Sequence, residues 1–157
     1  AKLFHLVEPD VACFGQKDIQ QATLVRNMVR DLDWPIDLVV VPTAREPDGL
    51  ALSSRNVYLA PGERNQAVAL SRALAAACAA WAGGERSAAR LERAMTDTLA
   101  AYPGVSADYI AVIEPRNLLP VSTAEAGTIL ALAARVGATR LIDNAILGEE
   151  TALCSAI

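Results

Sequence analysis

The segment DGLALSSRN, residues 48–56, is the stretch around which the rest of the chain is arranged. It follows an apolar run at residues 36–41 that predicts a buried strand, and it precedes a long alanine-rich segment that predicts a helix. Asp48-Gly49 marks a turn, where glycine accepts a positive φ without steric cost. A polar loop at the carboxyl end of a parallel strand is where α/β sheets bind ligands. The stretch therefore predicts an α/β fold with a ligand site in this loop.

The polar residues that end this stretch suit a polyphosphate. Ser53, Ser54, Arg55 and Asn56 supply two hydroxyls, a guanidinium and an amide. Arginine is always charged and offers several N–H donors, and serine hydroxyls with the free amides of a helix turn can complete a cradle for an anion. A surface turn that only caps a helix is the alternative interpretation of the same residues.

A second polar turn, GQKD at residues 15–18, lies earlier in the chain. It follows the run 11–14, which predicts a short, fully buried strand, and it precedes a helical pattern. Lys17 brings a mobile charge, and Asp18 can cap the helix, whose N-terminus attracts anions. Gln21 lies one helical turn further along, so its side chain is expected to point to the same side of the helix N-terminus as Lys17. A plain strand-to-helix turn with a solvated lysine is the alternative.

The order strand, helix, strand over residues 11–41 implies a right-handed parallel crossover. Because neighbouring parallel strands end at the same edge of a sheet, both polar turns are expected to open there. Together the two turns predict a phosphate site at this edge. The helix is expected to run to about residue 31 with a buried stripe of Ala22, Val25, Val29 and Leu32.

A domain boundary is predicted near Ala44, between residues 1–43 and residues 44–149, followed by a tail at 150–157. In the second part, one helix is expected over residues 62–82 with Pro61 in its first turn, and another over about 87–101. The pattern then becomes extended, with strands expected at 107–113, 128–136 and 139–147. Gly137 between the last two favours an antiparallel hairpin, so this part is predicted to be a small α+β domain.

Composition excludes several classes of protein. The net charge of −4 and pI near 5.0 argue against nucleic acid as the main partner. No apolar run reaches the roughly 18 residues of a membrane span. The cysteines, Cys13, Cys78 and Cys154, are far apart and odd in number, so they are expected to be buried small hydrophobes in a reducing cytoplasm.

The first residues, 1–8, predict the last turns of a helix with Leu3, Leu6 and Val7 on one face. His5 among them is expected to be a partly buried structural residue, since no partner base or nucleophile is near in sequence. The chain is accordingly expected to begin inside a larger protein.

Several stretches, taken in order, resemble the C-terminal part of the pantoate–β-alanine ligase (pantothenate synthetase) family. They are KLF at 2–4, PD at 9–10, CFGQKDIQQ at 13–21, DGLALSSRNVYL at 48–59 and RLIDN at 140–144. The resemblance implies a Rossmann-like nucleotide-binding domain followed by a small lid, in a cytoplasmic enzyme of the coenzyme A pathway that forms a homodimer. It implies that ATP and (R)-pantoate give pantoyl adenylate and pyrophosphate with Mg²⁺ held mainly by the phosphates, and that β-alanine then displaces AMP.

The resemblance also implies roles for individual residues. Lys17 would neutralise the phosphates as charge develops, Gln21 would hold pantoate, and Ser53 and Arg55 would act in a mobile phosphate loop related to the KMSKS loop of class I aminoacyl-tRNA synthetases. The positions that match the family's ATP contacts are Gly15, Gln16, Lys17, Asp18, Ala44, Leu52, Ser53, Ser54 and Arg55. Gln16 and Leu52 depart from the glutamate and methionine that are usual in the family.

The family's first half, with its His-x-Gly-His turn, has no counterpart in this sequence, and His5 matches no motif histidine. The chain by itself is therefore expected to lack full activity. Another nucleotidyltransferase of the same superfamily and a non-catalytic fragment used for association are the alternatives.

Overall fold

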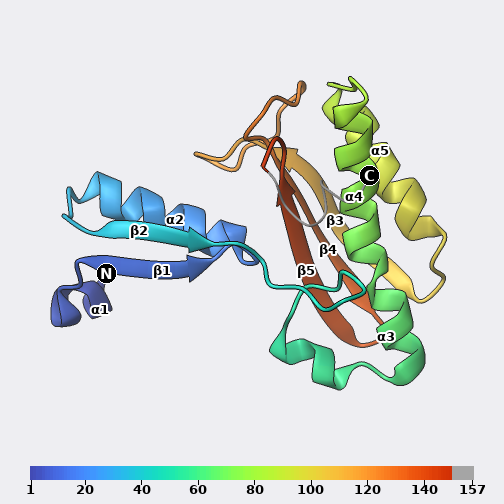
Figure 1. Ribbon diagram of the computed structural model, residues 1–157, viewed down its shortest axis with the longest axis horizontal. Coiled ribbons are helices and arrows are strands. Elements are labelled where there is room, and N and C mark those ends of the chain that lie inside the picture. Colours follow the sequence, from blue (N-terminus) through green and yellow to red (C-terminus); the bar gives the residue numbers. More distant parts are fainter. Residues whose placement is uncertain (150–157) are drawn as a thin grey trace.

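The computed structural model describes residues 1–149, which form two sheets joined by an extended loop (Figure 1). The predicted tail, residues 150–157, and Cys154 within it lie outside the described residues. The predicted α/β class with a parallel pair and an antiparallel sheet is confirmed.

The first part is a strand–helix–strand unit. Its elements are α1 (Lys2–Val7), β1 (Val11–Gly15), α2 (Ile19–Asp31) and β2 (Asp37–Val41). β1 and β2 are paired in parallel from Val11–Asp37 to Gly15–Val41, so their carboxyl ends meet at one edge, as the sequence predicts. Asp18 caps α2, because its carboxylate accepts a hydrogen bond from the backbone N–H of Gln21 at 3.2 Å.

The expectation that these strands are fully buried is wrong. In both strands, exposed residues alternate with half-buried ones, and Cys13 is exposed as well. A sheet of two strands has two open edges, and a single helix, α2, lies along it (Figure 1). The prediction of a buried stripe on α2 is confirmed at Ala22 and Val29. Leu32, which lies beyond the end of the helix, is 51% exposed.

α1 is held by aromatic contacts instead of a buried apolar stripe. Leu3, Leu6 and Val7 are all exposed, and so is His5, which corrects the expectation of a partly buried histidine. The His5 and Phe4 rings meet Trp34 edge to face, with centroid distances of 4.9 and 5.7 Å. Phe4 also meets Phe14 of β1 edge to face, with a centroid distance of 6.4 Å, so aromatic rings join α1 to the strand–helix–strand unit.

The second part packs helices on an antiparallel sheet with the order β3-β4-β5. Its elements are the 3₁₀ helix η1 (Ser54–Tyr58), α3 (Pro61–Ala67), α4 (Ala69–Ala82), α5 (Ala88–Ala100), β3 (Val105–Ile113), β4 (Ile129–Val136) and β5 (Thr139–Ile146). The predicted hairpin is confirmed: β4 and β5 are antiparallel, and Gly137 turns with a φ of +56°. The predicted helix at 62–82 is two helices, because Val68 has a ψ of −13° that interrupts the helical geometry.

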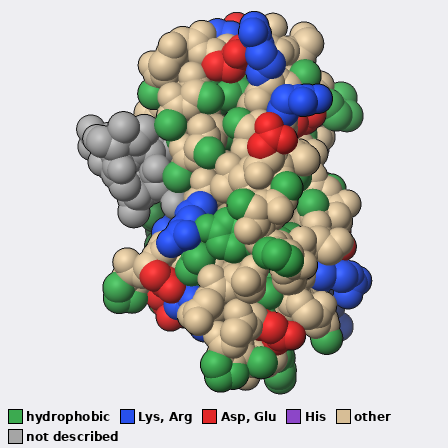
Figure 2. All heavy atoms as spheres, turned by 90° about the vertical axis from the view of Figure 1, so that its right-hand side faces the viewer, with side chains coloured by type: hydrophobic (Ala, Val, Ile, Leu, Met, Phe, Trp, Pro, Cys, Tyr) green, Lys and Arg blue, Asp and Glu red, His purple; other side chains and the backbone are tan. Residues whose placement is uncertain are grey.

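The core lies between the three-stranded sheet and the pair α4 and α5, which cover one of its faces (Figure 1). Its largest fully buried side chains include Leu70, Leu74, Leu91, Met95, Leu130 and Leu132. The outer face over these helices carries acidic and basic side chains close together, without one extended basic patch (Figure 2). Within residues 1–149, no helix combines the length and apolar character that crossing a membrane requires.

Candidate functional site

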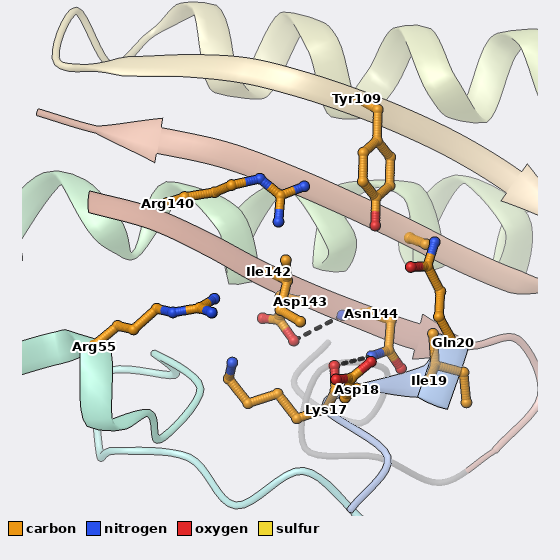
Figure 3. A pocket seen from close by; sticks show the side chains of 11 residues that line it. Lys17, Asp18, Ile19, Gln20, Arg55, Tyr109, Arg140, Ile142, Asp143 and Asn144 are labelled. Atoms are coloured by element: carbon orange, nitrogen blue, oxygen red, sulfur yellow. Dashed lines mark hydrogen bonds between the residues drawn. The ribbon is translucent and has the colours of Figure 1, made fainter. Parts of the chain in front are cut away.

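A cavity of about 180 Å³ opens where the carboxyl end of β1, the η1 loop and the sheet of the second part come together. Lys17, Arg55 and Arg140 all line it, and Figure 3 shows their charged groups directed into it from three different segments. The predicted convergence of the lysine turn and the serine–arginine turn on one cleft is therefore present. Three cationic groups outnumber the two carboxylates, Asp18 and Asp143, that line the same cavity, and this arrangement is chemically suited to an anion.

Burial perturbs the charged group of Lys17. Its side chain is half-buried, and this burial lowers the pKa of its ammonium, with the nearby Arg55 and Arg45 acting in the same direction. Asp143 and Asp18 oppose the shift and raise the pKa of the same group. A desolvated ammonium among guanidinium groups gains stability when an anion enters, so this electrostatic arrangement favours phosphate binding.

The loop before η1 is fixed by a buried ion pair. The Arg45 guanidinium donates to both carboxylate oxygens of Asp143 on β5, with distances of 2.7 Å from Nη1 to Oδ2 and 2.9 Å from Nη2 to Oδ1. Arg45 also donates to the carbonyl of Gly49 at 3.0 Å. Gly49 has a φ of +92°, as the Asp-Gly turn predicts. The turn that begins the polar stretch is thus tied to the sheet wall of the cavity.

A second anchor lies one residue further along β5. The side-chain amide of Asn144 donates to the backbone carbonyl of Gln16 at 2.9 Å. It also donates to the backbone carbonyl of Lys17 at 3.0 Å (Figure 3). Its Oδ1 accepts a hydrogen bond from Gln16 Nε2 at 3.3 Å. Two consecutive residues of β5, Asp143 and Asn144, therefore hold both loops that bring cations to the cavity.

The serine–arginine loop has the predicted cap as well as a place in the site. Ser53 Oγ accepts a hydrogen bond from Arg55 N at 3.2 Å and so caps η1. Ser53 and Lys17 line the same narrow crevice beside the cavity. Ser53 can therefore cap η1 and still contact a ligand, because its hydroxyl keeps its O–H donor and a second acceptor position.

The remaining predicted residues lie around this centre in different ways. Leu52 is 50% exposed, and its N–H donates to the carbonyl of Ala44 at 2.9 Å, so these two residues are joined through the backbone. Ser54 is exposed at the start of η1. Gly15 ends β1, and a Cβ built there would meet no atom within 4 Å, which leaves open space beside the turn.

Of the predicted site residues, only Lys17, Asp18 and Arg55 line the cavity wall, and Gln16 and Gln21 lie outside it for different reasons. Gln16 is buried, with its side chain turned to Asn144. Gln21 is exposed on α2, and the cavity wall includes its neighbour Gln20 instead. The first turn of α2 starts at Ile19, and its rotation, set by the buried Ile19 and Ala22, directs position 20 to the cavity.

Sequence reasoning missed the wall that the second part supplies: Arg140, Asp143 and Asn144 on β5, and Tyr109 on β3. Burial raises the pKa of the Tyr109 phenol, an effect that Arg140 opposes. The sequence did contain an indication of this wall, because Asp143 and Asn144 interrupt the apolar residues of the predicted last strand. Among residues 1–149, no group of three or more histidine, cysteine, aspartate or glutamate side chains is placed to hold a metal ion.

Comparison with known proteins identifies the family. The family model for pantoate-beta-alanine ligase matches residues 1–146. The pantothenate synthetase of Heliobacterium modesticaldum is 51% identical over 146 residues, which are 93% of this chain and 52% of that protein. The pantothenate synthetase of Anaeromyxobacter dehalogenans is 56% identical over 144 residues, or 92% of this chain and 50% of that protein. The chain thus spans about half the length of these curated relatives.

Solved structures agree with this assignment. The crystal structure of pantothenate synthetase from Thermus thermophilus matches with a TM-score of 0.87 at 49% identity, covering 92% of this chain and 52% of that one. Pantoate-beta-alanine ligase from Francisella tularensis, in complex with beta-gamma ATP and beta-alanine, matches with a TM-score of 0.60 at 26% identity, covering 92% and 46%.

Proposed function

Because the chain belongs to the pantoate-beta-alanine ligase family, we propose that it forms one side of the active site of an enzyme that joins (R)-pantoate to β-alanine with the energy of ATP. The products would be pantothenate, AMP and pyrophosphate. Pantothenate biosynthesis in the cytoplasm, on the route to coenzyme A, is the setting that this reaction implies.

The convergence of Lys17, Arg55 and Arg140 on one cavity carries this proposal. ATP brings several negative charges close together, and a wall of three cations from separate segments matches that distribution. The desolvated ammonium of Lys17 would bear on the phosphates, while Ser53 and Arg55 would enclose them from the η1 loop. The relative from Francisella tularensis, solved with beta-gamma ATP and beta-alanine, supports the same choice of ligands.

In the first step, a pantoate carboxylate oxygen would form a bond to the α-phosphorus while the bond from that phosphorus to the bridging oxygen of pyrophosphate breaks. Lys17 would stabilise the negative charge that grows on the phosphate oxygens, which is an electrostatic contribution. In the second step, the amine of β-alanine would attack the acyl carbon, lose a proton and release AMP. The proposed ATP contacts are Gly15, Gln16, Lys17, Asp18, Ala44, Leu52, Ser53, Ser54 and Arg55. We keep Gln21 as the proposed pantoate contact, although it lies on the exposed surface of α2 here.

A magnesium ion fits this site only as a partner of ATP. The cavity wall offers the carboxylates of Asp18 and Asp143, and Asp143 is already paired with Arg45. Phosphate oxygens would therefore supply most of its ligands, and the bound ion would offset part of the phosphate charge. We also propose residues 1–43 as part of a nucleotide-binding domain, residues 44–149 as its lid, and a homodimer as the assembly.

The test is ATP–pyrophosphate exchange by the full-length protein, since the relatives are about twice as long as this chain. We expect exchange only when (R)-pantoate is present, and formation of pantothenate and AMP in equal amounts when β-alanine is added. Exchange that does not need pantoate would favour another nucleotidyltransferase of the same superfamily. A full-length protein that neither binds ATP nor exchanges pyrophosphate would favour a role in association.

A further inference from the structure

We propose that Asn144 is the positioning residue that sets the lysine turn, and that it acts on the reaction through Lys17 without touching the substrates. The proposal rests on the proposed function for its kinetic consequences, but its structural part stands independently. Asn144 lies on β5 and is 2% exposed, so its amide is part of the interior. None of the expectations drawn from the sequence gives it a role.

The lysine turn leaves carbonyl groups that no sheet or helix satisfies. Gln16 and Lys17 stand between the end of β1 and the cap of α2. Gln16 N donates to the carbonyl of Val41 at 2.8 Å, which fixes one side of the turn to β2. The carbonyls of Gln16 and Lys17 accept from Asn144 Nδ2 at 2.9 and 3.0 Å, which fixes the other side.

Both the nitrogen and the oxygen of the Asn144 side-chain amide make hydrogen bonds. An asparagine amide has two N–H donors, and the structure gives it two carbonyl acceptors in the turn. Its oxygen accepts from Gln16 Nε2 at 3.3 Å, and Gln16 is 4% exposed, so this bond closes the arrangement in the interior. These three hydrogen bonds leave the amide one orientation, because turning it over would set its N–H groups against those of Gln16.

This arrangement determines where the ammonium of Lys17 stands. One carbonyl that Asn144 holds belongs to Lys17 itself, so the hydrogen bond fixes the backbone from which the side chain reaches the cavity. Asn144 belongs to the sheet of the second part, whereas the turn belongs to the first part. The amide therefore sets the position of one cationic loop against the wall that carries Arg140.

Asn144→Asp is the sharpest variant, because it keeps the shape of the side chain and removes the donors. A carboxylate would place oxygen against two carbonyl oxygens. Asn144→Ser is a milder second variant, which keeps a hydroxyl donor but shortens the side chain and adds no charge. Asn65→Asp, on the exposed surface of α3, is the matched control for the change of charge.

Two measurements on the full-length protein decide the proposal. Amide hydrogen exchange is compared for residues 15–18, for β5 and for the core helices α4 and α5. Within residues 15–18 the reporter is the N–H of Gln16, which donates to Val41. We expect its exchange to quicken by at least about tenfold in Asn144→Asp and less in Asn144→Ser, with α4 and α5 unchanged. Steady-state kinetics should show a fall in kcat of at least about tenfold in Asn144→Asp, and less than about a threefold change in KM for ATP. Asn65→Asp should match the parent in both measurements.

Each outcome bears on the proposal. Parent-like exchange at residues 15–18 in both Asn144 variants would overturn it, as would equal quickening over the whole second part, which is the mark of a purely structural residue. If Asn144→Asp does not fold, Asn144→Ser decides in the same two measurements. If the parent shows no pantoate-dependent reaction, the proposed function fails, while hydrogen exchange still decides whether Asn144 holds the turn.

Discussion

Arg45 and Asp143 form a buried, two-pronged ion pair between the loop that leaves β2 and the wall of the cavity. Their side chains are 9% and 2% exposed, and both carboxylate oxygens accept from the guanidinium, at 2.7 and 2.9 Å. Such a pair is costly to break, because removing one partner leaves an uncompensated charge in the interior. It joins residues 98 apart in the sequence, and it places the η1 loop beside Lys17.

Breaking this pair should destabilise the protein strongly. We expect Asp143→Asn to lower the free energy of unfolding by about 3–5 kcal/mol, because the Arg45 guanidinium stays buried without its counter-charge. Urea denaturation of the full-length protein measures the change. The matched control is Asp31→Asn, since Asp31 pairs with Arg30 at 2.8 Å on the surface and an exposed pair contributes about 0–1 kcal/mol. Equal effects of the two substitutions would contradict this account of the buried pair.

The role proposed for Lys17 has a kinetic consequence. In the full-length protein, Lys17→Ala should cost roughly 2–4 kcal/mol of transition-state stabilisation, or about 30- to 900-fold in kcat/KM. The chain has one other lysine, the exposed Lys2 on α1, so Lys2→Ala is a control that should leave the rate unchanged. A rate of Lys17→Ala within a factor of about two of the parent would refute the assigned role.

The lowered pKa of Lys17 can be observed directly. Since burial favours the neutral amine, Lys17 should lose its proton below the ordinary value of 10.5. The neutral amine is the form that acylating reagents attack, so the labelling rate of Lys17, followed by peptide mass spectrometry, should rise with a midpoint below pH 10.5. Its contribution to stability is unfavourable at neutral pH and vanishes as the pH rises towards 10.5.

Addition of ATP provides the internal check on this measurement. Phosphate charge beside the ammonium favours its protonated form, so the midpoint of Lys17 should move upwards and its labelling should slow. The labelling rate of the exposed Lys2 is the reference, because ATP in this cavity should not change it. A labelling profile of Lys17 that is the same with and without ATP would count against phosphate binding at this cavity.

A side chain at the hairpin turn of Gly137 would displace the carboxylate of Glu63. The φ of Gly137 is +56°, and a Cβ there would collide with the carboxylate of Glu63, which also accepts the N–H of Ala60 at the start of α3. Gly137→Ala should therefore lose this hydrogen bond, worth about 0.5–1.5 kcal/mol, in addition to the strain of a positive φ, whereas Gly127→Ala, which has a φ of +88° but open space around it, carries the strain alone. Thermal or urea denaturation of the two variants checks the difference. Equal losses would show that backbone conformation alone accounts for the effect.

The sequence by itself determined the features that depend on near neighbours. The cap at Asp18, the positive φ of Gly49, the apolar spacing of α5 and the Gly137 hairpin each follow from residues a few positions apart, and the structure contains all of them. The parallel pairing of β1 and β2 also follows, because the helix between them carries the chain back along the sheet, so that the second strand runs in the same direction as the first. Both cationic turns could therefore be found from the order of the residues alone.

Only the tertiary structure decided what stands opposite those turns. Asn144 donates to the carbonyl of Lys17, 127 positions away, and Asp143 pairs with Arg45, 98 positions away. No local sequence pattern predicts either contact. Burial was misjudged for the same reason: the run at 11–14 has the apolar character of a covered strand, but its exposure depends on which elements pack on it. Local propensity and periodicity fix how a segment folds, whereas contacts between distant segments fix which side chains share a cavity.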